Sequence, residues 1–334
     1  MTPRVSILLP AFNAADTLPA CLRSVQRQTE TRWQCVIVDD GSTDATLACA
    51  RGFADADRRF VVLPAPHRGI VAALNAGLEH CTGEVVARMD ADDLMHRHRL
   101  ALQLHALDAA PALAGVGCHV RIFPRQHLPD GRRLYERWLN SLDSARRVRE
   151  EAYVECPVAH PTLMLRTAVL RAVGYRDCDW PEDYDLLLRL LAAGQEIGVV
   201  PRRLVAWRDR PERLSRTCDH YALERFTACK AAFLAATLLA DVDTYILWGF
   251  GDTARTLHRA LLRHGKRPAY IVELHPGRLG NTIHGAPVIA PDALARVPRL
   301  PLVASVAGAG PRRQIRAALA ALGRRELHDF VCAA

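Results

Sequence analysis

The sequence lacks the apolar segments that would span a membrane or direct secretion. Its longest apolar helical run, residues 231–240, is about half of the ~20 residues that cross a bilayer. No signal peptide is recognisable, because residues 1–4 lead directly into a β-rich segment. None of the ten cysteines forms a Cys-x-x-Cys pair or has a zinc-like spacing with histidine. We therefore expect reduced thiols and a cytoplasmic protein.

Lysine is almost absent, although the chain is basic. Lys230 and Lys266 are the only lysines among 44 basic residues, which exceed the 36 acidic residues by 8. Residues 243–334 hold most of this excess, with 13 basic side chains against 6 acidic ones. Aromatic residues make up only 6% and do not interleave with the basic ones. We expect a solvated basic face and no nucleic-acid partner, while peripheral membrane association and a homo-oligomer are left open.

The length and the order of the sequence patterns predict two α/β domains, residues 1–240 and 243–334. Four apolar runs in the first domain have the composition of buried strands: residues 5–10, 35–38, 60–63 and 85–87. Helical spacings separate them, which predicts a doubly wound sheet with ligands at the carboxyl ends of its strands. Residues 124–149 are polar, arginine-rich and less regular, with Tyr135, Trp138 and Leu139 as possible helical anchors. This segment either lines an acceptor site or is plain surface.

Three carboxylates lie within four residues, Asp90 to Asp93, directly after the fourth apolar run. Carboxylates packed so closely repel one another unless a divalent cation lies between them. Asp90 and Asp92 are therefore candidate ligands for Mn²⁺ or Mg²⁺, an ion that usually carries phosphate ligands as well. Asp39 and Asp40 also follow a predicted strand, so that both acidic groups should reach one crevice. The alternative is a solvated acidic turn that caps the next helix.

Several blocks of the sequence carry a family resemblance: VSILLPAFNAADTLPACLRSV, VIVDDGSTDAT, RGIVAALNAGL and GEVVARMDADD. In composition, order and spacing they resemble the family 2 inverting glycosyltransferases of GT-A fold, over roughly residues 4–215. The resemblance implies a GT-A type doubly wound mixed sheet. It also implies metal-dependent transfer of a sugar from a nucleotide-diphospho-sugar, most simply a UDP-sugar, to a carbohydrate or glycoconjugate hydroxyl by single displacement.

The resemblance further implies roles for individual residues. It assigns Asp39 to the nucleotide base and the backbone of Pro10 and Ala11 to the side of the nucleotide. Asp90 is then near the ribose and diphosphate, and Asp92 is the main metal ligand.

The resemblance also implies catalytic and donor-binding residues in the second half of the first domain. Asp183 matches the general base that deprotonates the acceptor, a role typically worth 10²–10⁴-fold. Acids in a first helical turn also favour the helix dipole, which accounts well for Glu182 or Asp185. His160 matches a histidine near the donor sugar, with a satisfied core histidine as the alternative. Arg208 matches an arginine that could meet the diphosphate.

Two segments depart from the family pattern. Arg210 stands where a histidine is usual, which puts a metal or phosphate role at that position in doubt. Residues 97–100 read Arg-His-Arg-Leu in place of Pro-Asp-Arg-Leu, and we expect this to change a helix start without touching the metal.

The second domain begins with a strand, a Gly-x-Gly-x-x-Ala turn and a helix. Gly249, Gly251 and Glu273 have the spacing of a dinucleotide fingerprint and are a weak candidate NAD site. However, residues 280–289 resemble the small Rossmann-like domains appended to sugar-modifying enzymes, and the domain is short. We favour a structural, oligomerising or ligand-sensing domain over an NAD site. The alternatives for the whole chain are an NAD-dependent sugar-modifying enzyme and a non-catalytic nucleotide-sugar sensor.

Overall fold

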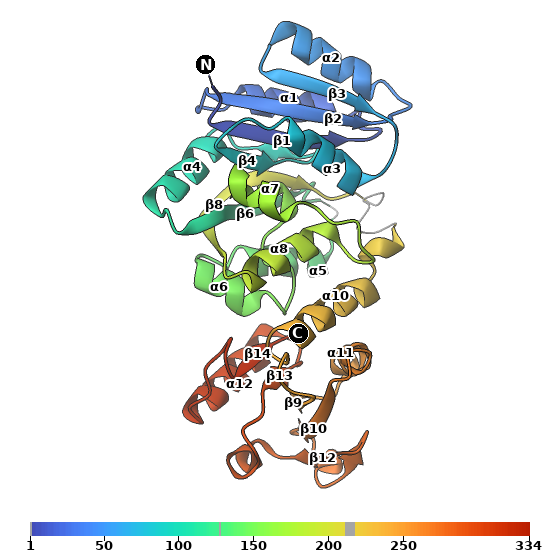
Figure 1. Cartoon of the computed structure of the whole chain (residues 1–334), viewed down its shortest axis with the longest axis vertical. Coiled ribbons are helices and arrows are strands. Elements are labelled where there is room, and N and C mark those ends of the chain that lie inside the picture. Colours follow the sequence, from blue (N-terminus) through green and yellow to red (C-terminus); the bar gives the residue numbers. More distant parts are fainter. Residues whose placement is uncertain (1, 127, 211–217) are drawn as a thin grey trace. The chain divides into compact units, whose positions relative to one another are not determined.

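The computed structural model describes residues 2–126, 128–210 and 218–334, and most of its elements are labelled in Figure 1. The chain divides into two compact units. The first comprises Met1–Val148, Val158–Cys178 and Asp185–Arg213, and the second comprises Arg149–Pro157, Asp179–Tyr184 and Leu214–Ala334. The second unit therefore includes two short segments that precede its main part in the sequence. The predicted domain limits, 1–240 and 243–334, are a division by sequence pattern and stay a prediction.

The first unit is built on a mixed sheet of eight strands in the order β3-β2-β1-β4-β7-β6-β8-β5. Its strands are β1 (Val5–Ala11), β2 (Trp33–Asp40), β3 (Phe60–Ala65), β4 (Val85–Arg88), β5 (Leu94–Met95), β6 (Leu113–Phe123), β7 (Met164–Arg166) and β8 (Glu196–Arg208). The first four strands are parallel to one another, whereas β7 is antiparallel to both of its neighbours. This mixed α/β sheet confirms the predicted fold class.

Helices cover both faces of this sheet because strand side chains alternate between the faces. Val5, Ile7 and Leu9 form a buried cluster with the apolar side chains of α1 (Leu18–Gln26). Leu8 points the other way, toward Gly77 of α3 (Ile70–Glu79), where a Cβ would also come within 2.8 Å of Val38. The absence of a side chain at Gly77 therefore lets α3 lie close to the sheet.

The remaining helices of the chain's first 192 residues are α2 (Thr46–Ala56), α4 (Arg99–Ala109), α5 (Asp130–Leu139), α6 (Ala145–Glu151), α7 (Thr167–Val173) and α8 (Glu182–Ala192), with a 3-10 turn at His160–Thr162. The segment 124–149 is more regular than expected, since α5 and most of α6 lie there. The three possible helical anchors, Tyr135, Trp138 and Leu139, all belong to α5. Helix α5 is held by tertiary contact: Leu139 is buried, and Tyr135 and Trp138 pack against the cluster that includes Trp207.

The second unit contains a sheet of six strands in the order β11-β12-β10-β9-β13-β14. The strands are β9 (Thr244–Trp248), β10 (Arg267–Val272), β11 (Thr282–Ile283), β12 (Ala286–Ile289), β13 (Leu302–Ala304) and β14 (Phe330–Cys332). All are parallel except β11, which forms a hairpin with β12. The unit also contains helices α10 (Leu223–Ala236), α11 (Asp252–Leu262) and α12 (Ala309–Ala321), and 3-10 turns at Asp219–Tyr221, Pro276–Arg278 and Pro291–Arg296.

The segment Arg149–Pro157 is integrated into the second unit by buried polar contacts. The Glu151 carboxylate is buried, and its oxygens lie 2.7 Å from Nη1 of Arg316 and 3.7 Å from Nη2 of Arg312. Lys230 Nζ donates hydrogen bonds to the carbonyl oxygens of Val154 and Ala333, at 3.2 and 2.8 Å. Because these groups are withdrawn from water, each partner is needed to offset the desolvation of the other.

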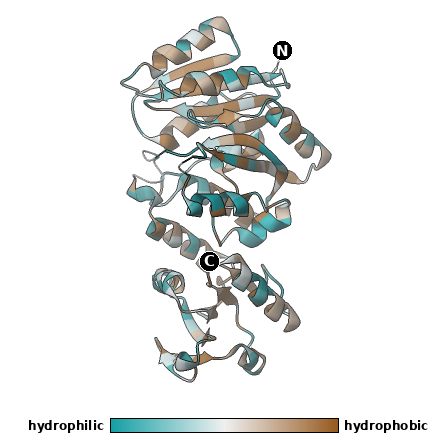
Figure 2. Cartoon of the chain, turned by 180° about the vertical axis from the view of Figure 1, so that it is seen from behind, coloured by the Kyte–Doolittle hydropathy of each residue, from teal (hydrophilic) through white to brown (hydrophobic). Residues whose placement is uncertain are grey.

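Apolar residues concentrate in the strands of both sheets, and the outer helices carry a polar side (Figure 2). Within the described ranges, no helix has both the length and the apolar character needed to cross a membrane.

Candidate functional site

The carboxyl ends of β1, β2 and β4 form one edge of the first unit's sheet. The parallel register pairs Ala11 of β1 with Asp39 of β2, and Leu8 of β1 with Arg88 of β4. The acids that follow β4 and those that end β2 are therefore brought to the same edge, as the alternation of strands and helices predicts. Pro10 and Ala11 end the strand between them, and β1 supplies the backbone of the crevice.

Asp90, Asp92 and Asp93 form a compact carboxylate cluster after β4. One oxygen from each lies within 4.8 Å of the others, and no other set of three or more His, Cys, Asp or Glu side chains does this in the described part of the chain. Asp90 and Asp92 are partly exposed, whereas Asp93 is fully buried. Carboxylate oxygens are the donors that Mg²⁺ and Mn²⁺ prefer, so this donor set fits the predicted ion.

Arg208, at the end of β8, is tied directly to this cluster. Its backbone N–H donates to Oδ1 of Asp93 at 2.7 Å, and its Nε donates to the backbone oxygen of Asp92, also at 2.7 Å. The guanidinium carbon lies 4.5 Å from the centre of the Phe123 ring. The structure thus places a cation beside the carboxylates, in a position to meet the anionic groups of a ligand held there.

Arg88 is a second cation at the cluster, and sequence reasoning missed it. It is buried at the end of β4 and forms an ion pair with Asp90. Its backbone oxygen accepts a hydrogen bond from Arg99 Nη2 at 2.9 Å. The signal in the sequence was an arginine inside an otherwise apolar strand, Val85-Val86-Ala87-Arg88, where an unpaired charge would be costly.

Asp39 and Asp40 are neighbours with different surroundings. Asp39 is 2% exposed; its Oδ2 accepts a 3.3 Å hydrogen bond from the Ser42 N–H, and its Oδ1 has no hydrogen-bond partner among the described residues. Asp40 is fully used: its oxygens accept from the N–H groups of Arg68 and Gly69 at 2.9 and 3.0 Å. A buried acceptor left unpaired is destabilising, so Asp39 is well placed to receive an N–H from a ligand.

An aromatic pair lies beside these aspartates. Phe12 is 44% exposed and stacks on His67, with ring centroids 4.1 Å apart. His67 Nδ1 lies 2.8 Å from Oδ2 of Asp40, which fixes the imidazole. The backbone approach is tight here, because a Cβ on Gly41 would lie 2.6 Å from the His67 nitrogen and its φ is +71°. Sequence reasoning missed Phe12, although an aromatic residue directly after Pro10-Ala11 was a visible signal.

His160 is buried in a 3-10 turn of the first unit. Its Nε2 lies 3.1 Å from the hydroxyl of Tyr175. Burial, and then the charge of Arg88, hold the pKa of His160 well below its usual value, so the ring is neutral at pH 7. The predicted role near the donor sugar stays a prediction, and the contact with Tyr175 is equally what a core histidine would make.

The three acids at the start of α8 are held differently. Glu182 is buried and accepts a 2.7 Å hydrogen bond from the Tyr221 hydroxyl, and Asp185 pairs with Arg189 at 2.6 Å. Asp183 is only partly buried, and its Oδ1 accepts a 2.7 Å hydrogen bond from the Tyr184 N–H. Asp183 belongs to the second unit and the carboxylate cluster to the first. Its assignment as general base stays a prediction.

The weak dinucleotide candidates lie together in the second unit, around a cavity of about 580 Å³. Gly249 follows β9 with φ +90°, and Gly251 caps α11. Glu273 follows β10, but its Oε1 accepts from the N–H of Phe250 and from Arg278, and its Oε2 from the N–H of Leu274. Both oxygens of Glu273 thus already accept hydrogen bonds from the protein, and the preference against an NAD site stays a prediction.

Comparison with known proteins shows that the chain belongs to glycosyltransferase family 2. The model "Glycosyl transferase family 2" matches residues 6–174, just over half of the chain. The putative glycosyltransferase EpsE of Bacillus subtilis is 28% identical over 240 residues, which cover 68% of this chain and 82% of EpsE. The amylovoran biosynthesis glycosyltransferase AmsE of Erwinia amylovora is 30% identical over 200 residues, covering 59% and 73%. The chain is therefore a glycosyltransferase.

Solved structures of other glycosyltransferases have a fold similar to that of this chain. TarS 1–349 of S. aureus, in complex with UDP, superposes with a TM-score of 0.53 at 17% identity, covering 79% of this chain and 72% of TarS. The mannosyltransferase PcManGT of Pyrobaculum calidifontis, in complex with GDP-Man and Mn²⁺, gives a TM-score of 0.55 at 22% identity, covering 79% and 73%. The first unit thus has the GT-A fold of these glycosyltransferases.

Proposed function

We propose that the chain is a metal-dependent inverting glycosyltransferase that takes a sugar from a nucleotide-diphospho-sugar, with UDP as the expected nucleotide. The observation that carries this proposal is the carboxylate cluster of Asp90, Asp92 and Asp93 beside Arg208, on the sheet edge where Asp39 keeps an oxygen without a partner. The relatives in complex with UDP, with UDP-GlcNAc and with GDP-Man plus Mn²⁺ support this class of donor.

In this proposal Asp90 and Asp92 hold the divalent ion. When bound, Mn²⁺ or Mg²⁺ stabilises the negative charge of the departing nucleotide diphosphate. Arg208 adds a cation whose orientation is fixed by the Asp92 carbonyl and the Phe123 ring. Asp93 has a different function, because it binds the backbone of Arg208 and so keeps the end of β8 next to the cluster.

The nucleotide base is proposed to lie between Phe12 and Asp39. A ring N–H of a uracil or guanine base would complete the hydrogen bonding of Asp39 Oδ1, and the exposed Phe12 ring offers a stacking surface. The acceptor hydroxyl would then be deprotonated by Asp183, whose side chain is oriented by the Tyr184 N–H. A glycan or glycoconjugate acceptor is in keeping with the amylovoran biosynthesis named for AmsE.

Thermal stabilisation of the full chain tests the proposal. UDP, GDP, CMP and NAD are added separately, with and without Mn²⁺, and the melting temperature is recorded. A ligand that binds only the folded state adds about 2.7 kcal/mol at 100 times its dissociation constant, which is easily measured. We expect a Mn²⁺-dependent shift with UDP. A shift with NAD alone would overturn the proposal, and a shift with GDP in place of UDP would correct the donor.

A further inference from the structure

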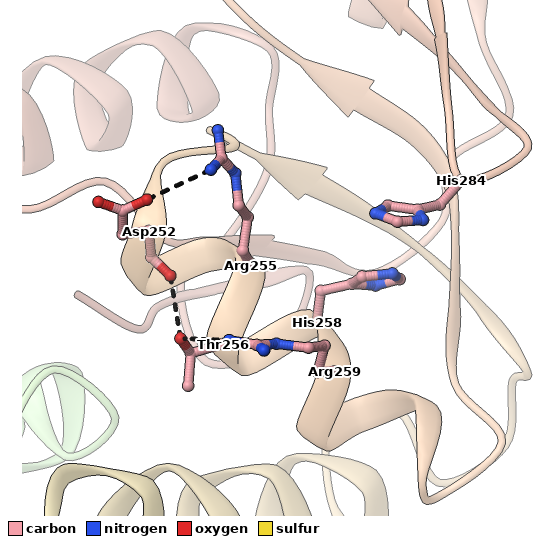
Figure 3. A pocket seen from close by; sticks show the side chains of 6 residues that line it. All are labelled: Asp252, Arg255, Thr256, His258, Arg259 and His284. Carbon is pink, nitrogen blue, oxygen red and sulfur yellow. Dashed lines mark hydrogen bonds and ion pairs between the residues drawn. The ribbon is translucent and has the colours of Figure 1, made fainter.

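The second unit contains a pocket that the proposed transfer reaction does not use. It has a volume of about 490 Å³, and its lining side chains are drawn in Figure 3: Asp252, Arg255, Thr256, His258, Arg259 and His284. Five of them come from α11, and His284 comes from the turn between β11 and β12. None of the six belongs to the carboxylate cluster or to the edge of the first sheet.

These six side chains line one pocket, with His258 and His284 on one side of α11 and Asp252 and Thr256 on the other (Figure 3). On α11, residues 252, 255, 256 and 259 follow the spacing of a single helix face. The pairing of Ile283 with Ala286 leaves His284 and Gly285 as a two-residue hairpin turn, with φ +50° and +80°. Both values are positive, as in a type I′ turn. The imidazole of His284 then lies over that of His258, with ring centroids 4.9 Å apart (Figure 3).

His258 is the buried group that points to a ligand. Its side chain is 2% exposed, yet neither ring nitrogen has a hydrogen-bond partner among the described residues. A neutral imidazole carries one donor and one acceptor, and buried groups of this kind are almost always paired. The rings of Phe250 and His284 lie beside the imidazole, with centroids 6.2 and 4.9 Å from its own. A polar ligand in the pocket would supply the missing partner.

The charge of the lining favours an anion. Arg255 and Arg259 outnumber the single carboxylate, Asp252, whose side chain is fully exposed and 3.4 Å from Arg255. Arg259 Nη2 lies 3.4 Å from the Thr256 hydroxyl oxygen, which is a long contact for a hydrogen bond. Two guanidinium groups, a hydroxyl and two imidazoles are donors suited to phosphate oxygens. The same arginines would repel a metal cation from the two histidines.

We propose that this pocket binds a phosphate-bearing anion, with Arg255 and Arg259 contacting phosphate oxygens and His258 donating a hydrogen bond. His284 completes the lining from the hairpin.

Proton uptake should accompany binding. Burial, and then the neighbouring His284, lower the pKa of His258, so the free pocket holds a neutral ring near pH 7. A bound anion would raise that pKa again, because its negative charge favours the protonated imidazole. Binding should therefore be accompanied by proton uptake, measured as a dependence of the titration heat on the buffer.

Calorimetric titration of the full chain with inorganic pyrophosphate, in EDTA, tests the proposal. The EDTA removes divalent ions, so that the proposed metal-assisted donor site does not contribute. We expect one saturable site, an affinity loss of at least about tenfold in Arg259→Gln and His258→Phe, and a change below about twofold in Arg263→Gln. Arg263 is exposed at the end of the same helix and does not line the pocket, so it controls for net charge.

Two further measurements separate the alternatives. His258→Phe keeps an aromatic ring beside Phe250, and its melting curve shows whether this variant still folds. If it does not fold, Arg259→Gln decides whether the pocket binds pyrophosphate, because this change is at an exposed residue. The absence of saturable pyrophosphate binding, or equal affinity in all three variants, would overturn the proposal. Saturable Zn²⁺ binding to the full chain that is lost in His258→Phe would overturn the anion proposal and identify the pocket as a metal site.

Discussion

Asp39 and Asp40 show how two adjacent residues of one type acquire separate functions from their contacts. The Asp40 carboxylate is occupied by two backbone N–H groups of the loop after β3, and Asp39 keeps an oxygen without a partner. One carboxylate therefore stabilises the loop, and the other is available to a ligand.

Substitution of each aspartate should separate these functions. Asp39→Ala should weaken UDP binding by about tenfold, the worth of a hydrogen bond to a charged group, and change the melting temperature little. Asp40→Ala should reduce the free energy of unfolding by about 1–3 kcal/mol, because two N–H groups lose their acceptor. Urea unfolding and calorimetry on both variants measure this, and equal effects of the two changes on UDP binding would contradict it.

Asp92 should control the coupling between metal and nucleotide. In Asp92→Ala the Mn²⁺ dependence of UDP binding should disappear, because one of two partly exposed carboxylates of the cluster is lost. UDP titrations with and without Mn²⁺ measure the coupling. Asp108→Ala is a suitable control, since Asp108 is an exposed acid that pairs with Arg4. Unchanged coupling in Asp92→Ala would remove this residue from the metal site.

Asp183→Asn should abolish sugar transfer and leave nucleotide binding within a few-fold. Asparagine retains an oxygen that can accept the Tyr184 N–H, so the local geometry should persist while the basic carboxylate is lost. Single-turnover transfer and UDP titration measure the two effects. A parallel loss of binding would give Asp183 a structural or ligand-binding role instead.

At the scale of elements, the predictable features are those encoded by local pattern. The strands that end at Asp40 and Arg88 follow from short apolar runs, and their parallel order follows from the intervening helices. The parallel order also brings the two acidic groups to one edge. In the polar, arginine-rich segment 124–149 the sequence offered possible helical anchors but no helix limits, because α5 is stabilised by contacts with residues distant in sequence, such as Trp207.

Contacts over long sequence separations could not be read from the sequence. The unpaired oxygen of Asp39, the stacking of Phe12 on His67, and the hydrogen bond from Arg208 to Asp92 each depend on the finished fold. The same holds for the start of α4, where Arg99 is buried and contacts β4. The expected effect of the departure at residues 97 and 98 on the helix start stays a prediction.

Arg99 of α4 should therefore contribute to the stability of the folded chain. Its Nη2 donates to the Arg88 carbonyl, and its Nε donates to Gln103, which itself bridges the carbonyls of Val116 and Thr162. Arg99→Leu leaves this network incomplete and should lower the free energy of unfolding by about 1–3 kcal/mol. Urea unfolding measures this. Arg97→Leu, an exposed change two residues earlier, should have an effect below about 0.5 kcal/mol.

At the scale of the whole molecule, the second unit depends on residues far from its main part. Glu151 is 1% exposed and meets Arg312 and Arg316, and Tyr184 donates a 2.7 Å hydrogen bond to the Ala152 carbonyl. Glu151→Ala should cost about 3–5 kcal/mol, because it leaves buried guanidinium charge without its partner. Denaturant unfolding measures the loss, and Asp292→Ala, at an exposed acid of the same unit, serves as a control. A loss below about 1 kcal/mol would show that Glu326 alone suffices for Arg316.

The contacts of the segment Arg149–Pro157 restrict how the two parts of the chain can be recombined during evolution. A recombination event that joined a different C-terminal module at residues 241–243 would bring in new partners for Glu151 and for the carbonyl of Val154. Unless those partners matched, the hybrid would carry a buried carboxylate without its arginines. Glu151, Arg312 and Arg316 should therefore occur together in homologues of this chain. Homologues that lack the C-terminal module should have another residue in place of Glu151.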